Sequence, residues 1–147
     1  MPHSFCSSLY HCVFSTKERR PLIVPEIQTR LWSYMGGVAR EHGMKSLIVG
    51  GMPDHVHLLL SLPSTLAVAD ALRAIKHGSS LWMHQSFQHF AWQQGYGAFS
   101  IGWRQVDVTV AYIEQQAEHH KKRDFQAEFL SILKKHTIEC DSRYIFG

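Results

Sequence analysis

The sequence contains few cysteines and no long hydrophobic segment, and each absence argues against a class of protein. Its three cysteines, Cys6, Cys12 and Cys140, form no Cys-x-x-Cys pair, which argues against a disulfide framework and a cysteine-bound zinc site. No apolar run reaches the roughly 18 residues of a membrane span. The first residues lack the basic and apolar regions of a signal peptide. We therefore expect a protein of the reducing cytoplasm that has no membrane partner.

The net charge is also low, at +3, because the 15 lysines and arginines outnumber the 12 aspartates and glutamates only slightly. A length of 147 residues suits one core, so we predict a single domain over residues 1–147. A small positive excess is weak evidence for a polyanionic partner. Its distribution says more, although solvated turns and helix ends have the same composition. The basic residues gather after one predicted strand and at the end of one predicted helix: Lys17, Arg19, Arg20, Lys121, Lys122 and Arg123.

Hydrophobic periodicity predicts the order β-α-β-β-α-β, followed by two further helices. The predicted strands are 8–16, 45–50, 55–62 and 96–101, and the predicted helices are 26–42, 66–87, 105–121 and 124–136. This order predicts an α+β, ferredoxin-like (RRM-like) antiparallel sheet with two helices on one face, a core at about 5–102 and C-terminal helices at about 105–136. The other face must meet solvent, a ligand, a partner or the C-terminal helices.

The third predicted strand begins with two histidines one residue apart, His55 and His57, in a chain that has 11 histidines. Successive strand side chains point to opposite faces, so Val56 lies beneath the helices and both imidazoles lie on the other face. Two neighbouring imidazoles can chelate one metal ion. The alternative is a pair of polar residues on a solvated face, since roughly one such pair is expected by chance at this composition.

The third predicted helix has two stripes at 100° per residue. One stripe is apolar and consists of Val106, Val110, Ile113 and Ala117; the other, roughly 120° away, consists of Tyr112, Gln116, His119 and Arg123. Tyrosine is a competent nucleophile toward a phosphodiester that a divalent metal polarises. Gln116, one turn later, offers a hard oxygen ligand for Mg²⁺ or Mn²⁺ beside two imidazoles. The alternative is a solvated helix face with an amphipathic tyrosine.

These motifs together resemble the single-tyrosine HUH transposases of minimal bacterial insertion sequences and their REP-associated relatives. The resemblance runs through nearly the whole chain, in YHCVFSTKERRPL (10–22), GGMPDHVHLLLSLP (50–63), IKHGSS (75–80), FAWQQGYGAFS (90–100) and YIEQQAEHHKKRDFQAEF (112–129). A lone His-x-His pair is a weak signal. The same pair followed at this distance by a tyrosine and a glutamine one turn apart is a specific one.

The resemblance implies cleavage and rejoining of single-stranded DNA through a 5′-phosphotyrosine on Tyr112. It implies that His55, His57 and Gln116 bind Mg²⁺ or Mn²⁺, that DNA hairpins mark the element ends, and that the enzyme is a homodimer. In that dimer the tyrosine helix of one subunit can serve the histidines of the other. The candidate DNA contacts are Lys17, Arg19, Arg20, Lys76, His119, His120, Lys121 and Arg123.

Three alternatives stay open. An RRM-like sheet binds RNA without catalysis by stacking bases on exposed aromatics, although His55, His57 and Leu59 suit metal better than stacking. A different metal-dependent hydrolase would use the histidine pair without the tyrosine. A domesticated HUH endonuclease would bind and cut chromosomal repeats without moving an element.

Overall fold

The computed structural model describes residues 5–116, 124–136 and 138. The elements are β1 (Leu9–Ser15), α1 (Pro25–Glu41), β2 (Lys45–Met52), β3 (His55–Ser61), α2 (Val68–His84), β4 (Gly97–Ile101), α3 (Val106–Glu114) and α5 (Phe125–Lys135). Seven of these eight elements end within a few residues of their predicted bounds. The order β-α-β-β-α-β followed by helices is therefore confirmed.

The third helix is the exception. Helix α3 ends at Glu114, and the backbone of Gln115 (φ −98°, ψ 25°) departs from helical geometry. The prediction of one continuous helix over 105–121 is therefore wrong. Its last part, residues 117–121, lies outside the described residues.

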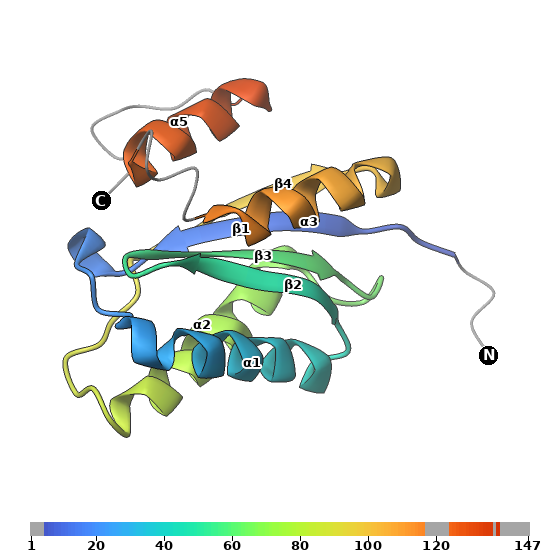
Figure 1. Cartoon of the computed structure of the whole chain (residues 1–147). Helices are drawn as coiled ribbons and strands as arrows, with labels where there is room; N and C mark the ends of the chain where they lie inside the picture. The colour runs from blue at the N-terminus through green and yellow to red at the C-terminus, as the bar shows by residue number, and fades with distance from the viewer. Residues whose placement is uncertain (1–4, 117–123, 137, 139–147) are drawn as a thin grey trace.

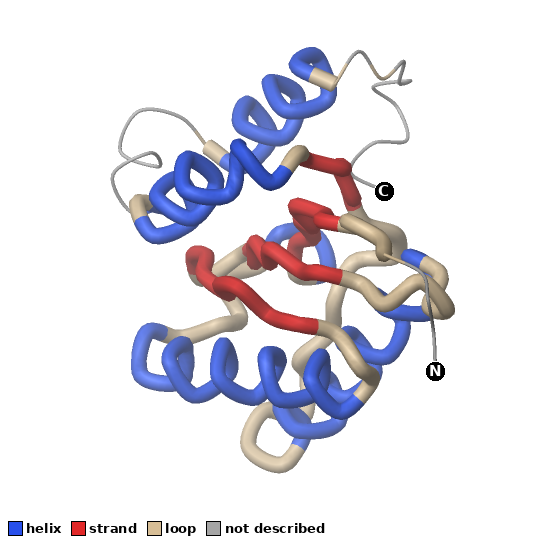
Figure 2. The backbone as a smooth tube through the Cα atoms, turned by 90° about the vertical axis from the view of Figure 1, so that its right-hand side faces the viewer, coloured by secondary structure: helices blue, strands red, loops and turns tan. Residues whose placement is uncertain are grey.

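The four strands form one sheet in the order β2-β3-β1-β4, and every neighbouring pair is antiparallel. The predicted α+β class with an antiparallel sheet is thus confirmed. Helices α1 and α2 cover one face of the sheet, while α3 and α5 lie over the other, so the sheet is the middle of three layers (Figures 1 and 2). The central strands β3 and β1 are consequently enclosed on both faces.

The larger core lies between the sheet and the pair α1 and α2. Alternate residues of β3 point into it, as the period of two predicted for Val56, Leu58 and Leu60. They meet fully buried side chains of β1, α1 and α2, namely Cys12, Phe14, Leu31, Met35, Leu72 and Ile75. Each fully buried aliphatic side chain contributes about 1.5–3 kcal/mol, so this layer supplies most of the apolar burial that holds β3 in place.

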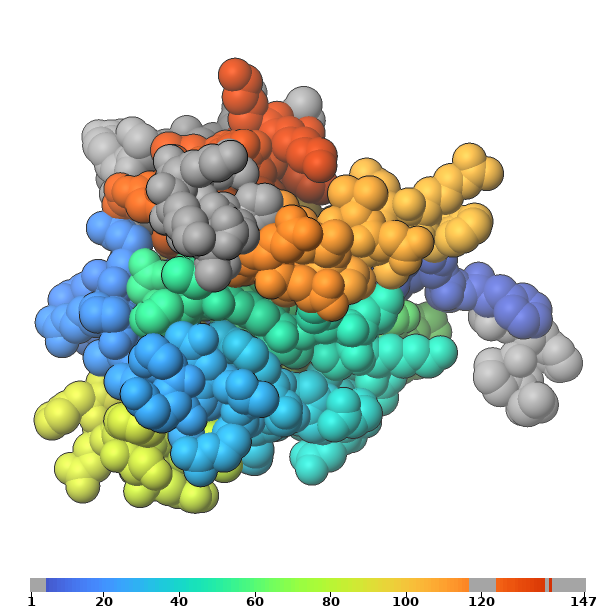
Figure 3. Space-filling view, in the orientation of Figure 1, coloured from blue at the N-terminus to red at the C-terminus, as the bar shows by residue number. Residues whose placement is uncertain are grey.

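A smaller core attaches α5 to the opposite face, where Val13 and Phe99 pack against Phe125, Phe129 and Leu133. Helix α3 rests on β2 and β3, and its atoms lie directly against these strands in the space-filling view (Figure 3). A Cβ at Gly50 would lie only 3.1 Å from Ile113 Cγ2 and 3.2 Å from its carbonyl oxygen. Glycine at that position lets the helix approach this closely. The interpretation of this face as a solvated surface is therefore wrong, because the C-terminal helices cover it.

Among the described residues, no helix combines the length and the apolar character that a bilayer crossing requires.

Candidate active site

The two histidines of β3 lie beneath α3 and α5. His55 and His57 are both fully buried, on the face opposite to Val56 and Leu58. Their places at alternate positions of one strand turn both imidazoles toward the same layer, and the rings are 5.2 Å apart between centroids. The sequence prediction that they are neighbours on one face is confirmed, and the alternative of a solvated polar pair is wrong.

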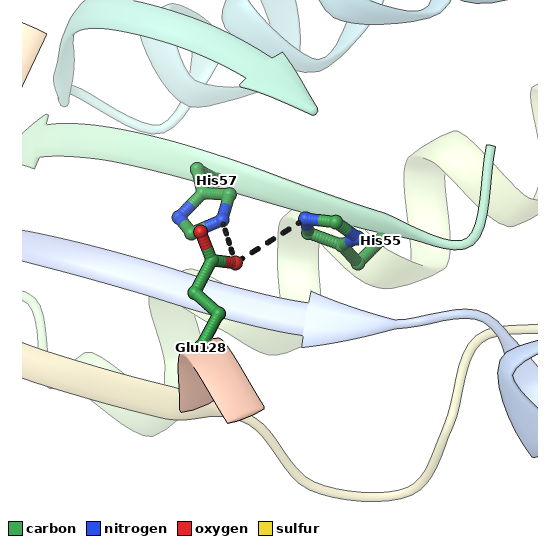
Figure 4. Close-up of side chains that lie close together, drawn as sticks. All are labelled: His55, His57 and Glu128. Carbon is green, nitrogen blue, oxygen red and sulfur yellow. Dashed lines mark hydrogen bonds and ion pairs between the residues drawn. The ribbon is translucent and has the colours of Figure 1, made fainter. Parts of the chain in front are cut away.

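A buried glutamate of α5 joins the two imidazoles. Glu128 lies on the inner surface of its helix between Phe125 and Phe129, which pack on the sheet. Its Oε1 is 3.0 Å from Nε2 of His57 and 3.4 Å from Nε2 of His55 (Figure 4). The carboxylate is fully buried, so water does not compensate its charge and the imidazoles do.

The tyrosine and the glutamine of the third helix reach the same place. Oε1 of Gln116 is 3.0 Å from Nε2 of His55, and its amide nitrogen is 3.3 Å from Oε2 of Glu128. The hydroxyl of Tyr112 donates a hydrogen bond to Oε2 of Glu128. The Tyr112 ring centroid is 5.8 Å from that of His57. Four residues proposed from two separate motifs therefore converge on one carboxylate within a single chain.

The remaining ring nitrogen of each histidine has its own partner. Nδ1 of His55 is 2.7 Å from Oδ1 of Asp54, and Nδ1 of His57 is 2.8 Å from Nε2 of His11 on the neighbouring strand β1. The rings of His11 and His57 are stacked, with centroids 5.0 Å apart. These contacts orient both imidazoles so that their Nε2 atoms face each other and Glu128.

The local pKa values follow from burial and from these contacts. Burial alone would lower the pKa of His55, but hydrogen bonds to Asp54, Glu128 and Gln116 outweigh it and raise the value to about 9. Burial would raise the pKa of Glu128, yet the imidazoles and the Tyr112 hydroxyl hold it well below its usual range. Burial, with the nearby charge of His57, lowers the pKa of His11 to about 3. Without a bound cation, the site thus pairs an ionised carboxylate with a protonated His55 and a neutral His11. A metal ion would take the place of the His55 proton, because an imidazole binds a metal in its neutral form.

The converging donor atoms also suit a divalent metal ion. One nitrogen from each of His55 and His57 and one carboxylate oxygen of Glu128 lie within 4.8 Å of one another. Metal-binding histidines normally present one nitrogen to the ion while a second group holds the other nitrogen, which is the arrangement that Asp54 and His11 provide. The residues present therefore fit a metal centre, with Gln116 Oε1 as a further oxygen beside it.

The predicted DNA contacts are distributed differently. Lys17, Arg19 and Arg20 occupy a turn after β1, and the Arg19 guanidinium lies 2.8 Å from the side-chain amide of Gln126 on α5. Arg20 forms an exposed ion pair with Glu18. This turn therefore lies beside the helix that carries Glu128, and its role toward DNA stays a prediction.

Lys76 lies elsewhere, on helix α2 at the far face of the sheet. Its ammonium donates to the carbonyl oxygens of Gln93 and Gly95, each at 2.7 Å, and thereby fastens the loop before β4 to α2. It is not near the histidines. The other predicted contacts lie outside the described residues: His119, His120, Lys121 and Arg123.

Sequence reasoning missed Glu128, His11 and Asp54. The signal for Glu128 was its position three residues after Phe125 and one before Phe129, which places a carboxylate within the apolar stripe of a helix. The signal for His11 was the period of two on β1, which puts it on the same face as Val13, the cross-strand partner of His57. Either signal shows which face a side chain is on. That Glu128 and His11 contact the histidines of β3 becomes clear only once the positions of α5 and β1 against β3 are known.

Comparisons with known proteins identify a family and relatives to which this chain is similar. A family model described as "Transposase IS200 like" matches residues 4–116. The ISDra2 transposase TnpA of Deinococcus radiodurans is 27% identical over 115 residues, which cover 73% of this chain and 82% of that protein. The transposase for insertion sequence element IS200 of Salmonella typhimurium is 25% identical over 140 residues, 90% of this chain and 89% of that protein.

Two solved structures have similar folds. The crystal structure of a putative transposase from Deinococcus radiodurans gives a TM-score of 0.65 at 25% identity and covers 79% of this chain and 95% of that one. A REP-associated tyrosine transposase bound to a REP hairpin gives a TM-score of 0.61 at 18% identity, over 82% of this chain and 73% of that one. The second likeness concerns the fold alone.

We predict that Glu128→Ala lowers the free energy of unfolding by about 3 kcal/mol, because it leaves two buried imidazoles without their shared carboxylate. Urea denaturation at neutral pH in the presence of a chelator measures this effect. Glu114→Ala, at an exposed position of α3, is the matched control and should change the value by less than about 0.5 kcal/mol. Equal stability of the Glu128→Ala variant and the wild type would contradict the proposed compensation of charge.

Proposed function

The chain belongs to the IS200-like transposase family, and from this membership and the site we propose that it cuts and rejoins single-stranded DNA with Tyr112 as the nucleophile. One observation carries the proposal: the Tyr112 hydroxyl, two imidazoles and a carboxylate converge at one buried point. A nucleophile beside a candidate metal centre is the arrangement that phosphoryl transfer by a side chain requires. The activity proposed is that of a DNA transposase acting on an element with hairpin ends.

In the cleavage step, Oη of Tyr112 attacks the phosphorus of a phosphodiester and the bond from phosphorus to the 3′ oxygen breaks. The proton of Tyr112 leaves along its hydrogen bond to Oε2 of Glu128 and is passed on to solvent water, while water gives a proton to the departing 3′ oxygen, so that no net proton is gained or lost. The products are a 5′-phosphotyrosine and a free 3′ hydroxyl. Attack by a second 3′ hydroxyl on the phosphotyrosine rejoins DNA and restores Tyr112, so no energy-rich cofactor is consumed.

We propose that His55 and His57, with Oε1 of Glu128 and Oε1 of Gln116, hold Mg²⁺ or Mn²⁺. Such an ion, when bound, polarises the scissile phosphate as a Lewis acid. The set differs from the one expected from sequence, because Glu128 adds a negative charge to two imidazoles and a neutral amide. Carboxylate and amide oxygens suit Mg²⁺ and Mn²⁺. Asp54 and His11 act on the other ring nitrogens and hold both imidazoles in orientation.

Two further features of the proposal concern DNA and assembly. Hairpin recognition is supported by the structurally similar protein whose structure holds a REP hairpin. We propose that the protein is a homodimer. We also propose that residues 1–147 act as one domain, since α3 and α5 complete the site on the sheet of their own chain. Each subunit then uses its own tyrosine.

A domesticated endonuclease that acts on chromosomal repeats has the same chemistry and is the second candidate, favoured by the same REP-associated likeness.

We predict that the wild-type protein, with Mn²⁺ and single-stranded DNA that carries a hairpin and its flanking sequence, forms a protein–DNA adduct that survives denaturation. Tyr112→Phe should abolish the adduct, because it removes the attacking oxygen and little volume. Tyr96→Phe, which is partly exposed before β4, is the control and should leave the adduct unchanged. An adduct on the Tyr112→Phe variant would refute the assignment. DNA cleavage without any adduct would favour a metal-dependent hydrolase that uses the histidines and Glu128 alone.

We predict that His57→Ala weakens Mn²⁺ binding by about 100-fold or more, because it removes a ligand from a preformed set. Isothermal titration calorimetry with the metal alone measures this, without any DNA. His77→Ala, an exposed histidine of α2 on the other layer, is the control and should bind Mn²⁺ as the wild type does. Equal affinities of both variants would place the metal elsewhere.

We predict that an equimolar mixture of Tyr112→Phe and His57→Ala forms no adduct, because each subunit uses its own Tyr112 beside its own His57. Gel analysis of the mixture against each variant alone measures this. Adduct formation by the mixture would show instead that one subunit lends its tyrosine helix to the histidines of the other, as the resemblance allowed.

A further inference from the structure

A pocket of about 380 Å³ opens beside Tyr112, in the groove between α3 and α5. His11 of β1 contributes to it from the sheet, Val108 contributes from α3, and Ile132 contributes from α5. Two cations also line it, Arg104 from the turn before α3 and Lys135 from the end of α5. The residues His55, His57 and Glu128 do not line it, so the pocket adjoins the proposed metal centre without being part of it.

We propose that this pocket binds one unpaired nucleotide of the DNA substrate, the nucleotide whose 5′ phosphate becomes linked to Tyr112. The inference rests on the proposed function, which supplies the nucleophile and the strand. It adds the position and the side chains that receive that nucleotide.

The geometry of phosphoryl transfer identifies which nucleotide this is. In an in-line displacement, the attacking and leaving oxygens lie on opposite sides of the phosphorus. The 3′ oxygen, and the nucleotide that departs with it, therefore points away from Tyr112. The nucleotide on the 5′ oxygen stays attached to the phosphate and remains one bond from the phosphotyrosine. A pocket that Tyr112 itself lines is within reach of this retained nucleotide.

The lining matches the two parts of a nucleotide. Val108 and Ile132 stand on facing helices and offer apolar walls to a base. Arg104 and Lys135 offer positive charge to the next phosphate along the strand. Within the residues that the structure describes, neither cation forms an ion pair with a carboxylate. A phosphate can therefore approach either cation without displacing a carboxylate of the described residues.

The size of the pocket selects an unpaired base. Its volume is near the lower limit of small-molecule sites, which span roughly 300–1,000 Å³. One nucleotide fits such a space, whereas a base pair of a duplex does not. A single strand can place an unstacked base in a pocket of this kind. A double strand can do so only after a base pair has been broken, which costs free energy. The pocket is thus consistent with a substrate that is single-stranded at the cut.

The test uses a randomised single-stranded oligonucleotide library with Mn²⁺ and the full chain. The DNA linked to the protein is recovered after denaturation and sequenced from the phosphotyrosine outward, so that its first base is the one in the pocket. Val108→Trp and Ile132→Trp fill the pocket from either side. Leu130→Trp, at an exposed position of α5, is the matched control. Val108 is 72% exposed, so its substitution leaves the fold intact even if Ile132→Trp disturbs α5.

The contribution of the Lys135 charge to DNA binding is tested with the variant Lys135→Ala. Lys134→Ala on the same helix α5 is the matched control, because it removes an equal charge outside the pocket. Binding of a single-stranded oligonucleotide to the Tyr112→Phe variant, measured across salt concentrations, isolates affinity from catalysis. Lys135→Ala should reduce the slope of log affinity against log salt by about one, and Lys134→Ala should reduce it less.

We expect a base preference at the first linked nucleotide in the wild type. Each tryptophan variant should lower the rate of adduct formation by about tenfold or more and alter the preference at that position alone. Wild-type adducts with a random first base, together with pocket variants that behave like their controls, would overturn this inference and leave the proposed function standing. Absence of a Tyr112 adduct in the wild type would overturn the proposed function, and the inference with it.

Discussion

The arrangement of the C-terminal helices depends on one buried carboxylate. Glu128 has lost its hydration entirely, and an unpaired charge in such a place would cost several kcal/mol. The imidazoles of His55 and His57 on one oxygen, and Tyr112 with Gln116 on the other, compensate it. Two of these four residues come from β3, Tyr112 comes from α3, and Gln116 comes just after the end of α3. The carboxylate can therefore be satisfied only when α3 and α5 are both in place. Its burial therefore couples the docking of α5 to the assembly of the site.

The apolar contacts make that docking possible at short range. A Cβ on Gly97 of β4 would lie 2.6 Å from the Phe129 ring, so glycine there lets α5 settle onto the sheet. Gly50 has the same effect for α3 on β2. With Phe125 and Phe129 held on one side of Glu128 and Ile113 on the other helix, the polar cluster is enclosed by close packing. Close packing excludes water, and exclusion of water strengthens each charge interaction inside.

The parts of this site that follow from local periodicity could be predicted from the sequence. The period of two along β3 placed His55 and His57 on one face, and the period of the helix placed Tyr112 beside Gln116. Glu128 could not be predicted as their partner, because it is 71 residues from His57 and its role depends on how α5 docks. The end of α3 at Glu114 also escaped prediction, since the apolar and polar stripes continue past it and no glycine or proline marks the stop.

The covering helices also separate this molecule from other proteins with the same sheet. A ferredoxin-like sheet supports many functions, so function has to be argued from the residues on its faces. Binding RNA by stacking on the sheet needs aromatic side chains of central strands exposed to solvent. Here the corresponding face of β3 presents His55, His57 and Leu59, all fully buried under α3 and α5. Bases could stack on that face only if α3 and α5 were no longer packed on it. Loss of that packing would expose Glu128 to solvent and break its contacts with the histidines. The same burial that builds the site therefore argues against the sheet as a surface for stacked bases.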